Sequence, residues 1–279
     1  MSRLRTWFML PSWIWLWVLF VAPFAIVLAY SLLTRGPYGG LAAPWTLENY
    51  QRLVDPLYMV IMLRSFIMAA VATALCLVLA FPLALFISRA GKRKNLYLQL
   101  VILPFWTSFL VRTYAWLFLL RDTGLVNTVL QHLHIISAPL PLLYNDGAVL
   151  LGLVYGFLPF MVLPIYATLE KMDESLLEAA ADLGCPRWRA FWLVTVPLSV
   201  PGVIAGFLLC FIPIVGEFVI PDLLGGSETM MIGQTLWTEF FSNRDWPVAS
   251  AVAVALLCLL LVPIVVYQHI QMRALERGR

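Results

Sequence analysis

The chain has 279 residues, of which 62% are hydrophobic and only 12% are charged. One soluble core cannot bury so much apolar surface, so the composition excludes an ordinary soluble protein and indicates a polytopic membrane protein. The formal net charge of +3 comes from scattered residues without a dense basic face. We therefore expect no nucleic-acid partner.

Six stretches are apolar enough to cross a membrane, which takes about 20 residues; they are residues 13–33, 65–87, 100–120, 148–169, 199–220 and 248–268. The first follows Arg3 and Arg5, as in a signal peptide. Its apolar core is too long and lacks a cleavage site, so we interpret it as a retained span. The pattern predicts an all-α membrane protein with a single domain over residues 1–279.

Lysine and arginine residues indicate the orientation, because they accumulate in cytoplasmic loops. With the N-terminus inside, five of the 18 lie on the outer side and Arg112 lies within a span. The other twelve lie on the cytoplasmic side, together with both termini. These twelve are Arg3, Arg5, Arg89, Lys92, Arg93, Lys94, Lys171, Arg187, Arg189, Arg273, Arg277 and Arg279.

The third predicted span is rich in aromatic residues. Trp106, Phe109, Thr113 and Trp116 approximate one face of a helix. A ring face can bind a desolvated ammonium group, which makes Trp106 and Tyr114 candidates for contact with a cation. Packing and anchoring at the membrane interface are the alternative roles.

Prolines and paired glycines recur within the predicted spans. Pro104 and Pro213 each remove a backbone donor, which suits helices that line a cavity or a pathway. Gly202 and Gly206 are four residues apart and would let two helices approach closely. The alternative is packing without transport.

A short surface helix is expected over residues 175–183. Ser175 and Glu178 match a capping box, and Gly184 followed by Pro186 predicts the end of the helix. So short a helix is marginal alone in water, so something must hold it; a solvated connector between spans is the alternative. One face carries Leu176, Ala179, Ala180 and Leu183, and the other carries Glu174, Glu178 and Asp182.

Arg112 and Glu217 are ionisable residues within predicted spans, where charges are costly and mark functional candidates. Their depths differ by about 9 Å at 1.5 Å per residue. Two interpretations stay open. They form an internal ion pair, or Glu217 lines a route for a cation together with Asp222 at its outer mouth.

Several motifs are absent from the sequence. Without G-x-x-x-x-G-K-[ST] the chain has no P-loop, so we expect no cofactor in it, and ATP and Mg²⁺ would be bound by a partner. His132 and His134 have no clear third ligand nearby, which favours a solvated pair over a metal site. No hydrolase or metalloprotease motif occurs, so we predict a non-catalytic subunit.

The helix at 175–183 carries a family resemblance. Glu178-Ala179-Ala180, then Gly184, then Val196-Pro197 resembles the EAA loop of permease subunits in binding-protein-dependent ABC importers. In that family the loop forms a coupling helix that docks in a groove of the ATPase. The resemblance implies that Glu178 meets a basic residue of the ATPase, that Ala179 and Ala180 permit close approach and that Gly184 allows the turn. Asp182 would lie on the same docking surface.

Four further segments narrow the resemblance. LPFWTS, RTYAW, GEFVIPDLLGG and NRDWPVASA, at residues 103–108, 112–116, 216–226 and 243–251, look like permease subunits of putrescine/spermidine importers. This implies a type I importer permease of the bacterial inner membrane that carries polyamines inward by alternating access. The implied partners are a second similar permease, two ATPase subunits, a periplasmic binding protein and membrane lipid. The implied substrate contacts are Glu217, Asp222, Trp106 and Tyr114.

Three alternatives to a polyamine importer remain. An importer for iron or thiamine would share the EAA loop. A secondary transporter would need its own ion site and usually an inverted repeat, which we do not find. An intramembrane enzyme would need a nucleophile with a base, or a metal.

Overall fold

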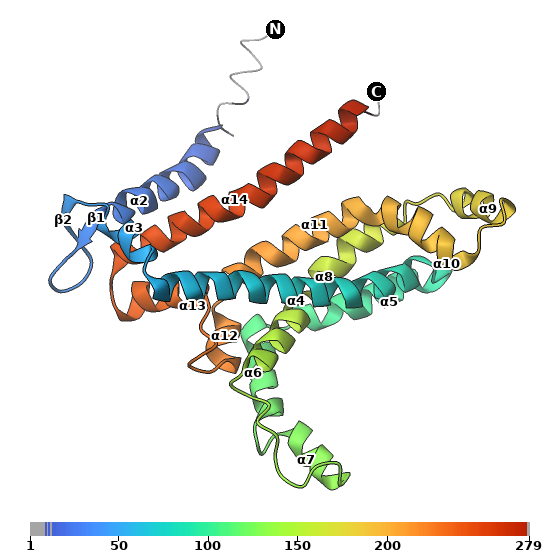
Figure 1. Cartoon of the computed structure of the whole chain (residues 1–279), viewed down its shortest axis with the longest axis horizontal. Coiled ribbons are helices and arrows are strands. Elements are labelled where there is room, and N and C mark those ends of the chain that lie inside the picture. The colour runs from blue at the N-terminus through green and yellow to red at the C-terminus, as the bar shows by residue number, and fades with distance from the viewer. Residues whose placement is uncertain (1–8, 10, 12, 278–279) are drawn as a thin grey trace. The chain divides into compact units, whose positions relative to one another are not determined.

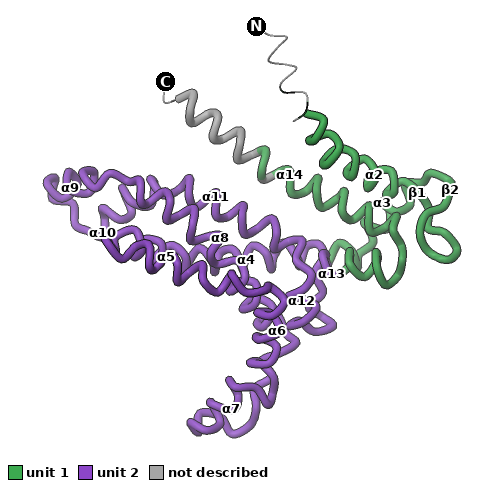
Figure 2. The backbone as a smooth tube through the Cα atoms, turned by 180° about the vertical axis from the view of Figure 1, so that it is seen from behind, with its two compact units in different colours: residues 1–60, 235–279 green, residues 61–234 purple. Residues whose placement is uncertain are grey.

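The structure is a computed structural model that describes residues 9, 11 and 13–277, so Arg3, Arg5 and Arg279 lie outside the described residues. Helices form most of the chain (Figure 1). It divides into two compact units, residues 1–60 with 235–279 and residues 61–234 (Figure 2). The boundaries fall within the helices α4 (Pro56–Ser88) and α13 (Ile232–Trp237). The predicted single domain stays a prediction.

The first unit pairs an N-terminal helix with the C-terminal one. Helix α2 (Ala22–Ser31) packs along α14 (Trp246–Arg277), and both figures show them side by side. The remaining elements are η1 (Trp17–Val21), β1 (Leu33–Arg35), β2 (Leu41–Trp45), α3 (Glu48–Leu53) and η5 (Thr238–Ser242).

A small antiparallel hairpin makes the all-α prediction wrong in one place. Strand β1 pairs with β2, with Thr34 opposite Ala42. The connecting turn contains Gly39 and Gly40, whose φ angles of 89° and 78° lie in the left-handed region. Glycine reaches that region without steric cost, so this turn can reverse the chain.

The second unit contains most of the helical mass. Its elements are η2 (Gly91–Arg93), α5 (Lys94–Ile102), η3 (Leu103–Trp106), α6 (Phe109–Leu120), α7 (Leu125–His132), α8 (Asp146–Leu169), α9 (Ser175–Asp182), α10 (Arg187–Ala190), η4 (Phe191–Thr195), α11 (Val196–Val215) and α12 (Val219–Leu224), with most of α4. Its core is the pair α8 and α11. At Gly202 an added Cβ would lie 2.6 Å from the Pro164 carbonyl oxygen. This confirms that a glycine allows close approach here.

Four helical stretches are long and apolar enough to cross a membrane: Trp13–Ser31, Pro56–Ser88, Asp146–Leu169 and Arg187–Val215. A fifth crossing is possible if Gly91–Trp106 and Phe109–His132 together form one span. The last predicted span falls on α14, whose described apolar part is the shorter stretch Trp246–Val262. The count of six therefore stays a prediction.

The third predicted span differs from the continuous helix expected over residues 100–120. It is broken after η3 and bent by 86°. Pro104 opens η3, and the backbone is extended at Thr107 and Ser108, with ψ angles of 156° and 138°. The Thr107 hydroxyl donates to the Pro104 carbonyl oxygen at 2.7 Å. A proline near such a turn explains the break, because it cannot supply the helical N–H bond.

Candidate functional site

The first candidate site is a segment that folds back on itself after α11. Helix α12 follows within four residues, and the chain then returns to Gly233, where an added Cβ would clash with the Gly216 carbonyl oxygen. The backbone N–H of Ile232 donates to the Ser65 hydroxyl of α4 at 2.7 Å. The chain then continues through α13 into η5.

Glu217 lies in the turn between α11 and α12. Its Oε1 accepts from the backbone N–H groups of Val219 at 2.9 Å and Ile220 at 3.4 Å. A carboxylate in this position satisfies free amides of the first turn and complements the positive end of the helix. In this structure Glu217 therefore holds the start of α12.

The ion pair between Arg112 and Glu217 is not formed. The Arg112 guanidinium lies 4.1 Å from the centre of the Phe105 ring, and its Nη1 donates to the Pro104 carbonyl oxygen at 3.3 Å. The bend before α6 brings these partners back toward Arg112, which removes the need for a distant carboxylate. The ion-pair interpretation was wrong here.

Asp222 is the exposed carboxylate of α12. Its Oδ1 accepts from Gln234 Nε2 at 3.0 Å. Both residues line an open cavity of about 540 Å³, together with Glu228 and Tyr144. Two carboxylates and a phenol at one cavity suit a cationic ligand. Neither Gln234 nor Glu228 was predicted from the sequence; for Gln234, the available signal was a polar amide within a short helix that also carries Ile232, Leu236 and Trp237.

The two aromatic candidates lie elsewhere. Trp106 is 81% exposed and Tyr114 is also exposed. Among the described residues, no hydrogen bond or ring contact joins either of them to Glu217 or Asp222. The aromatic cluster that does form centres on Tyr155 of α8, which stacks on Phe105 and meets Trp116 edge-on, with centroids 6.3 and 5.4 Å apart.

The second candidate site is α9, whose N-terminus differs from the expected capping box. Ser175 is the first helical residue, and its backbone N–H donates to Asp173 Oδ1 at 2.9 Å. Hydrogen bonds from Ser175 hold the pKa of Asp173 below its usual range. A capping box would have the Ser175 hydroxyl accept from the Glu178 N–H, but that N–H donates to the Glu174 carbonyl oxygen at 3.1 Å. Asp173, two residues before Ser175, is close enough in the chain to accept from the Ser175 N–H instead.

The C-terminus of α9 is as predicted. Gly184 has a φ of 76°. Its N–H donates to the Ala181 carbonyl oxygen and that of Cys185 donates to Ala180, both at 2.9 Å. This pair of hydrogen bonds is a Schellman motif, which provides donors for carbonyl oxygens that would otherwise be unpaired in the last turn. The helix ends where glycine permits the left-handed turn.

The surface of α9 is largely uncovered by this chain. None of its residues is buried, and Leu183 at its end is 88% exposed. Glu178 and Ala179 are exposed and Ala180 is half-buried. On the side toward α10 and η4, a cavity of about 320 Å³ separates Leu177 and Glu178 from the adjoining helices. An eight-residue helix with exposed leucines has the properties of a docking element.

Comparison with known proteins identifies the family. Residues 36–275 match the family described as binding-protein-dependent transport system inner membrane component. The chain belongs to this family. It is therefore a multi-pass inner-membrane permease component and not itself an enzyme.

Curated relatives are similar over 74% to 91% of this permease. It is 43% identical to the spermidine/putrescine transport system permease protein PotB of Haemophilus influenzae, over 91% of this chain and 89% of that protein. The protein of the same name from Escherichia coli K12 is 40% identical over 91% of this chain and 92% of its own length. The inner membrane ABC transporter permease protein YdcU of Escherichia coli K12 is 36% identical over 74% and 70%.

Solved structures share the fold at lower identity. A chain of a bacterial alginate ABC transporter, in complex with an alginate-bound periplasmic protein, matches with a TM-score of 0.75 at 17% identity, over 98% of this chain and 95% of that one. A chain of the MetNI methionine ABC transporter in an inward-facing conformation matches at 0.58 and 17%, over 77% and 96%. The permease thus has the fold of ABC importer membrane subunits.

Proposed function

We propose that this permease carries polyamines, putrescine or spermidine, from the periplasm to the cytoplasm as part of an ATP-driven importer. The observation that carries the proposal is the 43% identity to a spermidine/putrescine permease across 91% of the chain. A bundle with six spans and both termini in the cytoplasm agrees with the distribution of basic residues.

In this proposal α9 is the coupling helix. Its exposed face would dock on one of two ATPase subunits, with Glu178 and Asp182 toward basic residues and Ala179 and Ala180 in close contact. Support comes from the absence of buried residues in α9 and from the Schellman end at Gly184, which fixes the helix without help from its neighbours. ATP and Mg²⁺ would be bound by the ATPase subunits.

The substrate would pass along the segment around α12. Asp222 is the first residue we assign to it, because its carboxylate is exposed beside a cavity that Glu228 also lines. Glu217 would set the position of α12 and contribute negative charge, and Trp106 and Tyr114 would offer exposed rings to an ammonium group once the helices re-pack. A second permease subunit would complete the route, and a periplasmic binding protein would deliver the substrate.

The test is uptake by the complete transporter in proteoliposomes containing ATP and the binding protein. We expect uptake of labelled putrescine or spermidine that stops without ATP. Asp222→Asn should weaken apparent substrate affinity about tenfold, the scale of one charged hydrogen bond. Asp122→Asn, an exposed acid outside this cavity, is the control.

Two results would overturn the proposal. Uptake of thiamine or iron in place of polyamines would refute the substrate class. Uptake that persists without ATP as long as a proton gradient exists would refute the coupling to ATPases.

A further inference from the structure

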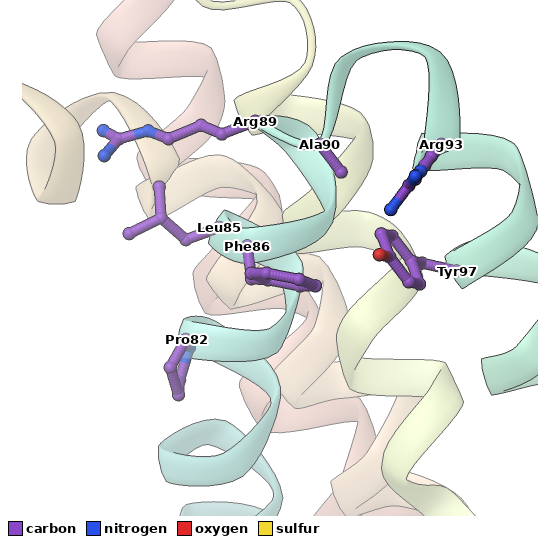
Figure 3. Close-up of a pocket in the computed structure, with 7 residues that line it drawn as sticks. All are labelled: Pro82, Leu85, Phe86, Arg89, Ala90, Arg93 and Tyr97. Carbon is purple, nitrogen blue, oxygen red and sulfur yellow. The ribbon is translucent and has the colours of Figure 1, made fainter.

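A pocket of about 510 Å³ lies where α4 turns into α5. Figure 3 shows its lining, which comes from the last turns of α4, the connecting turn and the first turns of α5. Pro82 and Phe86 form the apolar part, and Arg93 reaches down beside the ring of Tyr97, whereas Arg89 extends to the opposite side. The pocket therefore has an apolar floor, formed by Pro82 and Phe86, and a basic rim, formed by Arg89 and Arg93.

The apolar part of the pocket is open to its surroundings. The Phe86 side chain is 58% exposed, and its ring meets that of Tyr97 with centroids 5.2 Å apart. Pro82 lies seven residues before Arg89, which corresponds to about 10 Å along a helix. The apolar residues and the basic residues of the pocket therefore lie at different depths along α4, as the acyl chains and the headgroup do in a phospholipid.

Within the part of the chain that the structure describes, the arginines of the rim have no acidic partner. Among the described residues, no salt bridge includes Arg89 or Arg93. The acid near this corner, Glu170, already binds Lys94, with Nζ and Oε1 2.6 Å apart. A free guanidinium fits a phosphate group with two parallel hydrogen bonds.

The position along α4 agrees with the headgroup region of a membrane. Its 33 residues extend about 50 Å, about 20 Å more than the hydrocarbon core. An end of α4 therefore reaches the lipid headgroups. The basic residues around this end mark the cytoplasmic side in the proposed orientation, and basic pockets between spans on that side suit anionic lipids.

We propose that this pocket binds an anionic phospholipid of the inner leaflet. Arg93 and the Tyr97 hydroxyl hold the phosphate, Arg89 adds positive potential, and an acyl chain lies on Phe86 and Pro82. This site is distinct from the polyamine route and does not depend on which solute the permease carries.

The test is native mass spectrometry of the complete transporter, purified from nanodiscs with equal phosphatidylcholine and phosphatidylglycerol. We expect phosphatidylglycerol to be retained preferentially. Arg93→Gln should lower that retention about fivefold, the effect of one basic residue near an anionic surface. Arg121→Gln, which removes an arginine outside this pocket, should leave it unchanged.

A second variant separates lipid from simple anion binding. Phe86→Ala keeps both arginines and removes the apolar floor, so it should also lower phosphatidylglycerol retention. The proposal is overturned if both lipids are retained equally, if millimolar inorganic phosphate displaces phosphatidylglycerol, or if Arg93→Gln releases an ATPase subunit while lipid retention stays the same.

Discussion

Replacing Gly184 by alanine tests whether the end of α9 controls coupling. Gly184 has a φ of 76°, and an added Cβ would meet no heavy atom of the described residues within 4 Å. The substitution therefore adds backbone strain without a steric clash. A residue other than glycine in the left-handed region costs about 1–2 kcal/mol. This shifts the opening equilibrium of the last turn of α9 by a factor of about 5–30.

Hydrogen exchange of the complete transporter measures this opening. The amides of Gly184 and Cys185 are bonded to Ala181 and Ala180, so exchange of these two amides should accelerate by that factor in Gly184→Ala. Polyamine uptake should fall while membrane insertion stays normal, because α9 has no buried residue to hold it once its end frays. Asparagine tolerates the left-handed region better, so Gly184→Asn should recover part of the uptake.

Gly91→Ala is the matched control. Gly91 also has a positive φ, 54°, and open space around it, but it lies in the connection between α4 and α5. It should leave exchange in α9 and uptake unchanged. The reasoning is refuted if exchange at Gly184 accelerates and uptake is unaffected, or if uptake is lost with no change in exchange.

Three further predictions concern coupling, packing and pH. Glu178→Lys should abolish ATP-coupled uptake with normal insertion, since it reverses charge on the docking face; normal uptake would contradict the coupling assignment. Gly202→Ala should destabilise the α8–α11 pair by about 1–3 kcal/mol in a thermal unfolding assay, whereas Gly156→Ala, whose added Cβ meets its nearest atom at 3.6 Å, should be tolerated. The hydrogen bond from Lys94 lowers the pKa of Glu170, so the stability gained over Glu170→Gln should be constant at neutral pH. It should be lost as the pH falls below the ordinary pKa of a glutamate, about 4.3, and through the lowered pKa; a difference in thermal unfolding that persists at still lower pH would refute it.

Local signals predicted α9 well. Its observed bounds, Ser175–Asp182, are within one residue of the expected helix, because Gly184 and Pro186 determine the end from the chain itself. The cap at its start was assigned to the wrong side chain. Asp173 and Ser175 both offer an oxygen near the first turn, and the sequence does not say which one an amide will meet.

Long-range partners were harder to predict. Apolar content alone made residues 100–120 look like one helix, and it could not reveal that Pro104 and the extended Thr107 would break it. Because the chain bends at this break, the Arg112 guanidinium lies over the Phe105 ring. The ion pair with Glu217, which was inferred from their depths along straight helices, is therefore not formed. The partner of Asp222, Gln234, lies twelve residues away across a turn, and no periodic pattern connects two such positions.

The way α9 is stabilised suits the transmission of movement. Asp173 accepts a hydrogen bond at its N-terminus, and backbone hydrogen bonds from Gly184 and Cys185 cap its C-terminus. The helix is therefore ordered without burying any of its residues against the chain. Energy from docking then need not be used to fold it. Glu170, the residue after α8, forms a salt bridge with Lys94 at the start of α5. A displacement of α9 would therefore reach α8 and α5 together, and breaking this bridge with Glu170→Gln should weaken coupling without weakening docking.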